Sequence, residues 1–175
     1  ESGFSPALFC LPGRPAVITP IQKVFAEPLL EHSPQGSLLP RARATQYLER
    51  HYLSAERTLK HFVRGTIMLF YESGDNGGSK SIVAIARVRN AYLKPQDAIN
   101  RADFDPSVLN AETLSSIGRS KSKTVTVFDN LILFPKPVSM HDLREMGCGE
   151  PHQLLSTRPI TFEQLNKILN KALFP

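Results

Sequence analysis

The fold is decided by residues 66–88, TIMLFYESGDNGGSKSIVAIARV. This stretch contains two apolar runs, 66–71 and 81–88, on either side of a polar segment that is rich in glycine. Short apolar runs that contain β-branched residues and end at turn residues are typical of strands. We therefore expect two strong strands joined by a flexible hairpin loop. The loop connects strand to strand and lacks the GK[ST] ending of a Walker phosphate cradle, which argues against a nucleotide-phosphate site here.

The patterns outside this hairpin indicate an α+β domain. Ser139 and Thr161 stand at N-cap positions before two helical patterns, and proline or glycine marks most of the turns. We expect further strands at 16–18, 124–128 and 130–134, with a bend at Asn130, and helices at 19–29, 42–50, 139–147 and 161–169. The strands lie in the middle of the chain, with helices before and after them and no regular βαβ alternation. The sequence therefore predicts a small, curved mixed β-barrel or sheet with flanking helices.

The length and composition indicate one domain. The chain has 175 residues, of which 41% are hydrophobic and 21% are charged, and these are ordinary values for a globular domain. We expect residues 1–15 to form an irregular lead-in or edge strand and residues 16–175 to form a single domain. Because the first residue is Glu rather than Met, we also expect that the chain was cut from something longer, and an upstream fused domain stays open.

Several classes of function are disfavoured. No run reaches the roughly 20 apolar residues that a membrane helix needs, and the first residues lack the order of a signal peptide. We therefore expect a soluble cytoplasmic protein. The two cysteines, Cys10 and Cys148, lie far apart and outside any metal-ligand spacing, and the histidines are scattered. The sequence thus predicts no metal, no cofactor and no disulfide framework.

Positive charge is concentrated in two segments. The formal net charge is +5 at pH 7, which favours an anionic partner. Between residues 41 and 64 the basic residues are opposed only by Glu49 and Glu56, and residues 119–123 contain no acid. Uneven positive charge of this kind is what a surface that follows a phosphate backbone requires.

Four segments together carry a family resemblance: RHYLS (50–54), TIMLFYES (66–73), IVAIARV (82–88) and FDNLILFPKPV (128–138). In their order they resemble the PUA-like superfamily, most closely its EVE and ASCH branches, including copies fused behind an acetyltransferase domain. The resemblance implies a curved barrel of about five or six strands. It also implies a concave pocket that receives RNA or a modified base in relatives, with basic residues along the backbone path.

By matching position, the resemblance places site residues at the ends of two strands: Tyr71, Glu72 and Ser73, and then Lys121, Lys123 and Thr124. The sequence also departs from the superfamily. It contains no Trp, so the tryptophan cage of YTH relatives, which read a methylated adenine, cannot form. The Gly-x-Lys-x-x-Glu-x-Arg type of motif associated with ASCH proteins is not intact.

We expect a nucleic-acid-binding module, with RNA favoured over DNA and a modified base as a further option. Basic side chains would neutralise phosphates, and an aromatic ring from Tyr52, His51, Phe70 or Tyr71 would stack on an unpaired base. Phe70 and Tyr71 are neighbours in one strand and must point to opposite faces. The expected contact residues are Arg50, Tyr52, Arg57, Tyr71, Arg119, Lys121 and Lys123, together with Glu72, Ser73 and Thr124.

Two alternatives remain open. The first is a small amidohydrolase that acts on a modified nucleoside. It would use Glu72 for proton transfer and an activated Lys121 or Lys123 with Thr124 or Thr126. The second is a regulatory domain of a larger acetyltransferase fusion. No catalytic motif is present in the sequence, and we expect binding rather than enzymatic activity.

Overall fold

The computed structural model describes residues 13–30, 49–104, 107 and 111–174. The strands in these ranges are β1 Ala16–Ile21, β2 Arg50–Ala55, β3 Ile67–Glu72, β4 Ser81–Pro95, β5 Ser122–Ser139 and β6 Arg158–Ile160. The α-helices are α1 Lys23–Leu30, α2 Arg101–Phe104, α3 Ala111–Leu114, α4 Met140–Glu145 and α5 Phe162–Leu173. Short 3-10 turns are η3 Glu56–His61, η4 Asp75–Gly77, η5 Gln96–Ala98 and η6 Gln153–Leu155. None of the helices in the described ranges has the length and apolar content to cross a bilayer.

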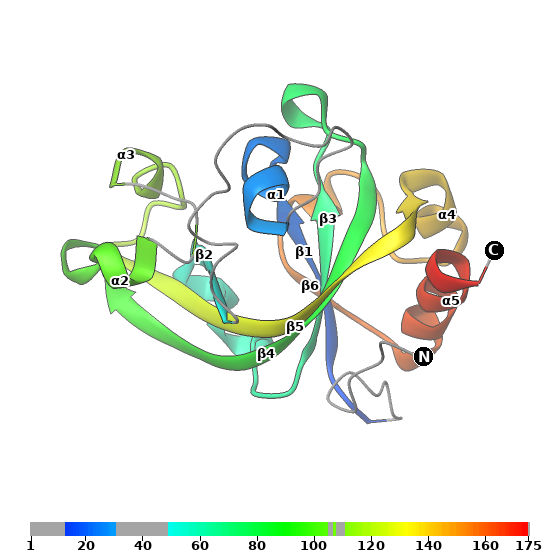
Figure 1. The fold of residues 1–175 in the computed structure, drawn as a ribbon, viewed down its shortest axis with the longest axis horizontal. Helices are drawn as coiled ribbons and strands as arrows, with labels where there is room; N and C mark the ends of the chain where they lie inside the picture. The colour runs from blue at the N-terminus through cyan, green and yellow to red at the C-terminus, as the bar shows by residue number, and fades with distance from the viewer. Residues whose placement is uncertain (1–12, 31–48, 105–106, 108–110, 175) are drawn as a thin grey trace.

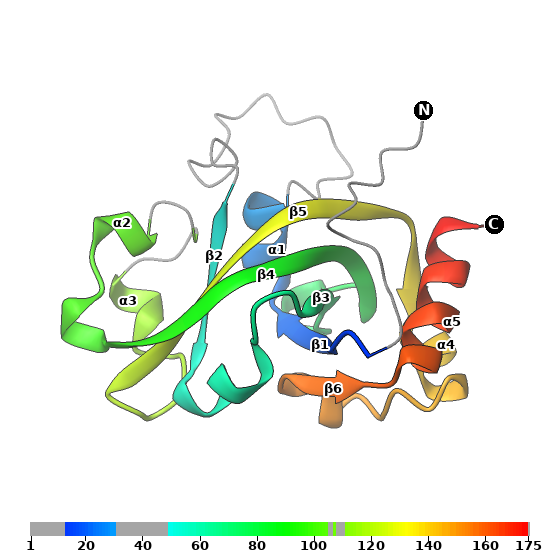
Figure 2. The same cartoon turned by 90° about the horizontal axis from the view of Figure 1, so that it is seen from below.

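One mixed sheet organises the domain. Its strand order is β2-β5-β4-β3-β1-β6, with β1 parallel to β3 and the other neighbours antiparallel. The long strands β4 and β5 curve across the molecule, and α4 and α5 lie together at one end of it (Figures 1 and 2). The α+β class and the curved mixed sheet are confirmed. The sheet does not close into a barrel, because its outer strands β2 and β6 are not paired with each other, and we call the opening between them the seam.

The central strand β3 is buried on both of its faces, and all six of its residues are buried. Tyr71 belongs to an apolar cluster that also contains Leu143 of α4 and Leu165 of α5. Phe70 belongs to a second cluster that contains Leu29 of α1. The two rings point to opposite faces as predicted, and neither reaches the surface.

The helix predicted from residue 19 begins later, at Lys23. Thr19, Pro20 and Ile21 instead continue β1 in parallel register with β3, so that Pro20 lies opposite Tyr71. Pairing with a buried neighbour therefore outweighs the local helix-start signal of a threonine followed by proline.

The helix predicted at 42–50 is wrong at its end, because Arg50 opens the strand β2 and lies opposite Phe128 of β5. The remainder of that predicted helix up to residue 48 falls outside the described residues, as does the predicted lead-in up to residue 12.

The two strands predicted at 124–128 and 130–134 form one strand, β5. Asn130 has a φ of 51°, the left-handed region that asparagine tolerates, and this residue bends the strand where the sequence predicted a bend. The strand β6 was not predicted, because three residues that include Pro159 are too short to produce a pattern.

Both predicted helix caps are confirmed. The Ser139 side chain accepts a hydrogen bond from the backbone N–H of Asp142 at the start of α4, and Thr161 accepts one from Gln164 at the start of α5. In each case the third residue of the helix bonds back to the backbone of the cap, which completes a capping box.

Replacing Thr161 with alanine should lower the free energy of unfolding by about 1 kcal/mol, because the first turn of α5 loses its capping hydroxyl. Thr161→Ser keeps the hydroxyl and should stay close to the wild type. Urea denaturation followed by circular dichroism measures both variants, and equal midpoints for wild type and Thr161→Ala would contradict the role of the cap.

Candidate functional site

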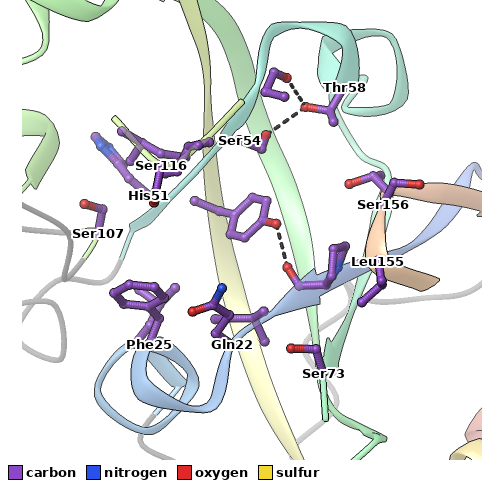
Figure 3. Close-up of a pocket in the computed structure, with 18 of the residues that line it drawn as sticks. Gln22, Phe25, His51, Ser54, Thr58, Ser73, Ser107, Ser116, Leu155 and Ser156 are labelled. Atoms are coloured by element: carbon purple, nitrogen blue, oxygen red, sulfur yellow. Dashed lines mark hydrogen bonds between the residues drawn. The ribbon is translucent and has the colours of Figure 1, made fainter. Parts of the chain in front are cut away.

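A pocket of about 260 Å³ opens at the seam. Figure 3 shows its walls, which come from β2, from the end of β1 and the start of α1, and from the segment that leads into β6. Ser73 and Asp75, which follow β3, complete one side. The pocket therefore lies where the sheet fails to close, and segments that are distant in sequence build it.

Tyr52 bridges the seam. Its hydroxyl donates a hydrogen bond of 2.6 Å to the backbone carbonyl of Pro20, so that a side chain links β2 to β1 where no backbone ladder does. The ring meets Phe62 and Phe70 edge-on, with centroids 6.3 and 6.1 Å away. Burial raises the pKa of Tyr52, and the phenol is neutral at physiological pH. The ring is thus a fixed aromatic wall of the pocket.

Hydroxyl groups supply much of the pocket's polarity. Thr19 and Thr157 share a buried hydrogen bond of 2.6 Å, which joins β1 to the segment before β6. Ser54 and Thr58 share another of 2.7 Å. Because a hydroxyl can donate as well as accept, these walls suit an uncharged polar ligand.

His51 also lines the pocket. Burial lowers the pKa of His51, and the negative charges of Asp103 and Glu49 partly oppose this effect. The ring is therefore neutral at pH 7. Its Nδ1 atom is buried and has no hydrogen-bond partner among the described residues.

Arg57 and Asp75 supply the formal charges at the pocket. Asp75 accepts a hydrogen bond of 3.3 Å from the Ser73 hydroxyl, and Arg57 is exposed. Within the described ranges no three His, Cys, Asp or Glu side chains are grouped so that they could hold a metal ion.

Three of the predicted site residues line this pocket, namely Tyr52, Arg57 and Ser73. Arg50 lies at the start of β2 and donates a hydrogen bond of 2.5 Å to the carbonyl of Leu29. Arg119 and Lys121 are exposed on the segment between α3 and β5.

The other four predicted site residues are buried, in contrast to the contact surface expected of them. Tyr71 donates to the sulfur of Met140 at 3.5 Å, and Glu72 accepts from the backbone N–H of Ser79 at 2.7 Å. The Lys123 ammonium donates to the carbonyls of Gly118 and Ser120, at 3.1 and 2.8 Å. Thr124 donates to the carbonyl of Ala55 at 3.1 Å. Three of these groups bond to backbone atoms, and Tyr71 bonds to a side chain of α4. All four are buried because both faces of the strands that carry them are covered.

The residues of the hydrolase alternative do not converge. Glu72 lies opposite Ser81, at one end of β4, whereas Lys123 lies opposite Lys94, at the other end. A carboxylate cannot exchange a proton with a group at the far end of a long strand, since general acid–base chemistry needs hydrogen-bond distances.

Gln22, Phe25, Ser54, Thr58 and Thr157 belong to the pocket and were missed by the sequence analysis. They come from three separate segments, and each follows an ordinary local pattern. Only the pairing of β6 with β1 brings Thr157 beside Thr19, so no local signal could have identified these residues together.

Comparison with known proteins agrees with the fold. The model of the EVE domain family matches residues 39–171. A serine-to-alanine mutant of the ASCH protein from Zymomonas mobilis superposes with a TM-score of 0.69 at 11% identity, covering 91% of this chain and 98% of that one. The crystal structure of ASCH from the same organism gives 0.65 at 11%, covering 89% and 94%. A Pseudomonas putida protein gives 0.55 at 18%, covering 90% and 99%. No curated protein matches the sequence significantly.

Tyr52→Phe should lower the free energy of unfolding by about 1 kcal/mol, because the carbonyl of Pro20 loses its donor across the seam. Tyr71→Phe is the matched control and should cost less, since the Tyr71 hydroxyl donates to the sulfur of Met140, a weak acceptor. Urea titration of both variants tests this order, and a larger loss for Tyr71→Phe would contradict it.

Stability should fall as the pH drops below about 6.5. In this window the unfolded chain already binds a proton on His51, whereas the folded chain, with its lowered pKa, binds it only at more acid pH. His51→Gln should reduce the fall without abolishing it, because burial also lowers the pKa of His61.

The measurement is the urea midpoint at about pH 7.5 and about pH 5.5. His152→Gln, at an exposed position, is the matched control and should keep the full pH dependence. The same slope in wild type and His51→Gln would show that His51 is not responsible.

Proposed function

Because the chain belongs to the EVE domain family, we propose that it is a nucleic-acid-binding module that receives a single unstacked base, plain or modified, in the seam pocket. The observation that carries the proposal is the position of exposed basic side chains at and beside a pocket whose other walls are mainly hydroxyl, aromatic and apolar groups. This combination provides phosphate contacts outside the pocket and base contacts inside it.

The size and chemistry of the pocket suit one base. Its volume of about 260 Å³ lies just below the range of about 300–1,000 Å³ that is usual for small-molecule sites, so it fits one planar ring system and not a stretch of duplex. The Tyr52 ring offers an aromatic wall, and hydroxyls such as those of Ser54 and Thr157 can pair with the edge of a base.

The basic side chains lie next to one end of the pocket. Arg57 lines it directly. The segment that carries Arg119 and Lys121 lies beside the start of η3, because the Ser120 hydroxyl donates to the Glu56 carboxylate. The three cations can therefore follow a strand whose base enters the pocket, with Arg50 at the opposite end of β2.

RNA is the polymer that we favour. Single-stranded loops and ends of RNA present bases that are already unstacked, and proteins read them in pockets of this kind. A base in duplex DNA would first have to be flipped out of the stack, at a cost of a few kcal/mol.

The test is fluorescence anisotropy with labelled single-stranded RNA, single-stranded DNA and duplex DNA over a range of salt concentrations. We expect tightest binding to single-stranded RNA, with a log–log slope of about −0.7 for each phosphate that the protein neutralises. The double variant Arg119→Glu/Lys121→Glu should bind more weakly, and its slope should be flatter by about 0.7 for each phosphate that is no longer neutralised.

Lys136→Glu provides the matched control, since it makes the same kind of charge change at an exposed site at the opposite end of β5 from Lys121. It should affect binding less than either Arg119→Glu or Lys121→Glu. If no polymer binds even at low salt, the proposal is wrong and the basic residues only solvate the surface.

A further inference from the structure

Consecutive residues of β2, from His51 to Ala55, all line the seam pocket. Neighbouring side chains in a strand point to opposite faces, and here Tyr52 and Leu53 pack in different apolar clusters. A pocket on a single face of β2 could not touch both sets of side chains. The pocket therefore lies along the outer edge of β2, where the main chain of this edge strand faces the seam.

The hydrogen bonding between β4 and β5 fixes which main-chain groups point outward. Directly opposite residues of antiparallel strands alternate between pairs that exchange two hydrogen bonds and pairs that exchange none. The backbone N–H of Gln96, just after β4, donates to the carbonyl of Lys121 at 2.7 Å, so this is a bonded pair. The next pair, Pro95 with Ser122, is then unbonded, which suits Pro95 because proline has no N–H.

The same alternation carries through β5 into β2, because neither pairing shifts register over these residues. The odd-numbered residues of β5 from 121 to 125 direct their N–H and C=O groups to β4. Thr124 and Thr126 consequently turn theirs toward β2. Their register partners there, Ser54 and Tyr52, complete the ladder.

His51 and Leu53 alternate with these ladder positions, so their main-chain N–H and C=O groups point away from β5 and into the seam. Within the described ranges, nothing bonds to these four groups. Leu53 is buried, with 4% of its surface exposed, and buried main-chain groups nearly always have a partner. The edge of β2 thus presents a donor and an acceptor side by side, and a ligand in the pocket can pair with them.

We propose that this outer edge of β2, through the main-chain N–H and C=O groups of His51 and Leu53, pairs with the Watson–Crick edge of the base in the seam pocket. The inference rests on the proposed function. An N–H beside a C=O matches the adjacent acceptor and donor that a base carries on that edge. The pocket volume of about 260 Å³ suits one ring system and not the several residues of an added β-strand. The ligand is therefore a base whose Watson–Crick edge is free, and modifications are accepted elsewhere on the ring.

The first test compares uridine, 3-methyluridine and 5-methyluridine in the anisotropy assay, each at one position of a single-stranded RNA and flanked by abasic nucleotides. The two methyl isomers have the same size, and only the N3 methyl group removes the donor on the Watson–Crick edge. Uridine and 5-methyluridine should bind alike. The 3-methyluridine strand should bind about tenfold more weakly, the loss expected from one hydrogen bond.

The second test follows single amides by hydrogen exchange and NMR. In the free protein the amides of His51 and Leu53 should exchange faster than those of Tyr52 and Ser54, which face β5. A saturating amount of the uridine strand should slow at least one of the two outward amides about tenfold, because a base then covers and accepts from it. The inward amides of Tyr52 and Ser54 are matched controls in the same strand and should change less.

The outcomes separate this inference from the proposed function. If no oligonucleotide binds the protein, both are overturned. If oligonucleotides bind with the expected salt dependence but the two methyl isomers bind equally, only the pairing with β2 is overturned, since size or another wall would then decide. The same holds if binding slows neither the His51 nor the Leu53 amide.

Discussion

A strand that is buried on both faces needs apolar side chains at almost every position, and β3 is such a strand. Its burial requires cover on two sides, which α1 provides for one face and α4 and α5 provide for the other. Its parallel pairing with β1 requires a long connection, because parallel strands cannot be joined by a tight turn. That connection contains α1, β2 and η3, which supply much of the pocket. The position of the candidate site is therefore a consequence of how the central strand is buried.

The success of the sequence predictions depends on how local each signal is. The apolar runs 66–71 and 81–88 and the caps Ser139 and Thr161 lie within a few residues of what they specify, and the structure confirms them. The three-residue strand β6 has no local pattern and was missed. Whether the two outer strands pair also depends on contacts between remote segments. The sequence therefore predicted a curved sheet but could not determine whether that sheet closes.

The predicted site residues also divide into those that the structure places at the pocket and those whose burial no local pattern indicated. Tyr52, Arg57 and Ser73 line the pocket, whereas Lys123 and Thr124 are buried in the frame. A basic residue in a strand is usually exposed, and Lys123 is an exception because its ammonium group is satisfied by two backbone carbonyls. Alternation along a strand identifies its two faces, but it does not show that both are covered.

The strand β1 has partners that are remote along the chain, since Ala16 lies opposite Ile67 in β3 and opposite Ile160 in β6. These pairings can stabilise the fold only after large loops have closed, which costs conformational entropy. Strand pairs between remote segments therefore form slowly. The bonds of Tyr52 to Pro20 and of Thr157 to Thr19 both end on β1. A chain emerging from the ribosome can therefore form its β3–β4 hairpin long before it has a pocket. The walls of the pocket are therefore complete only after β6 has been synthesised and paired.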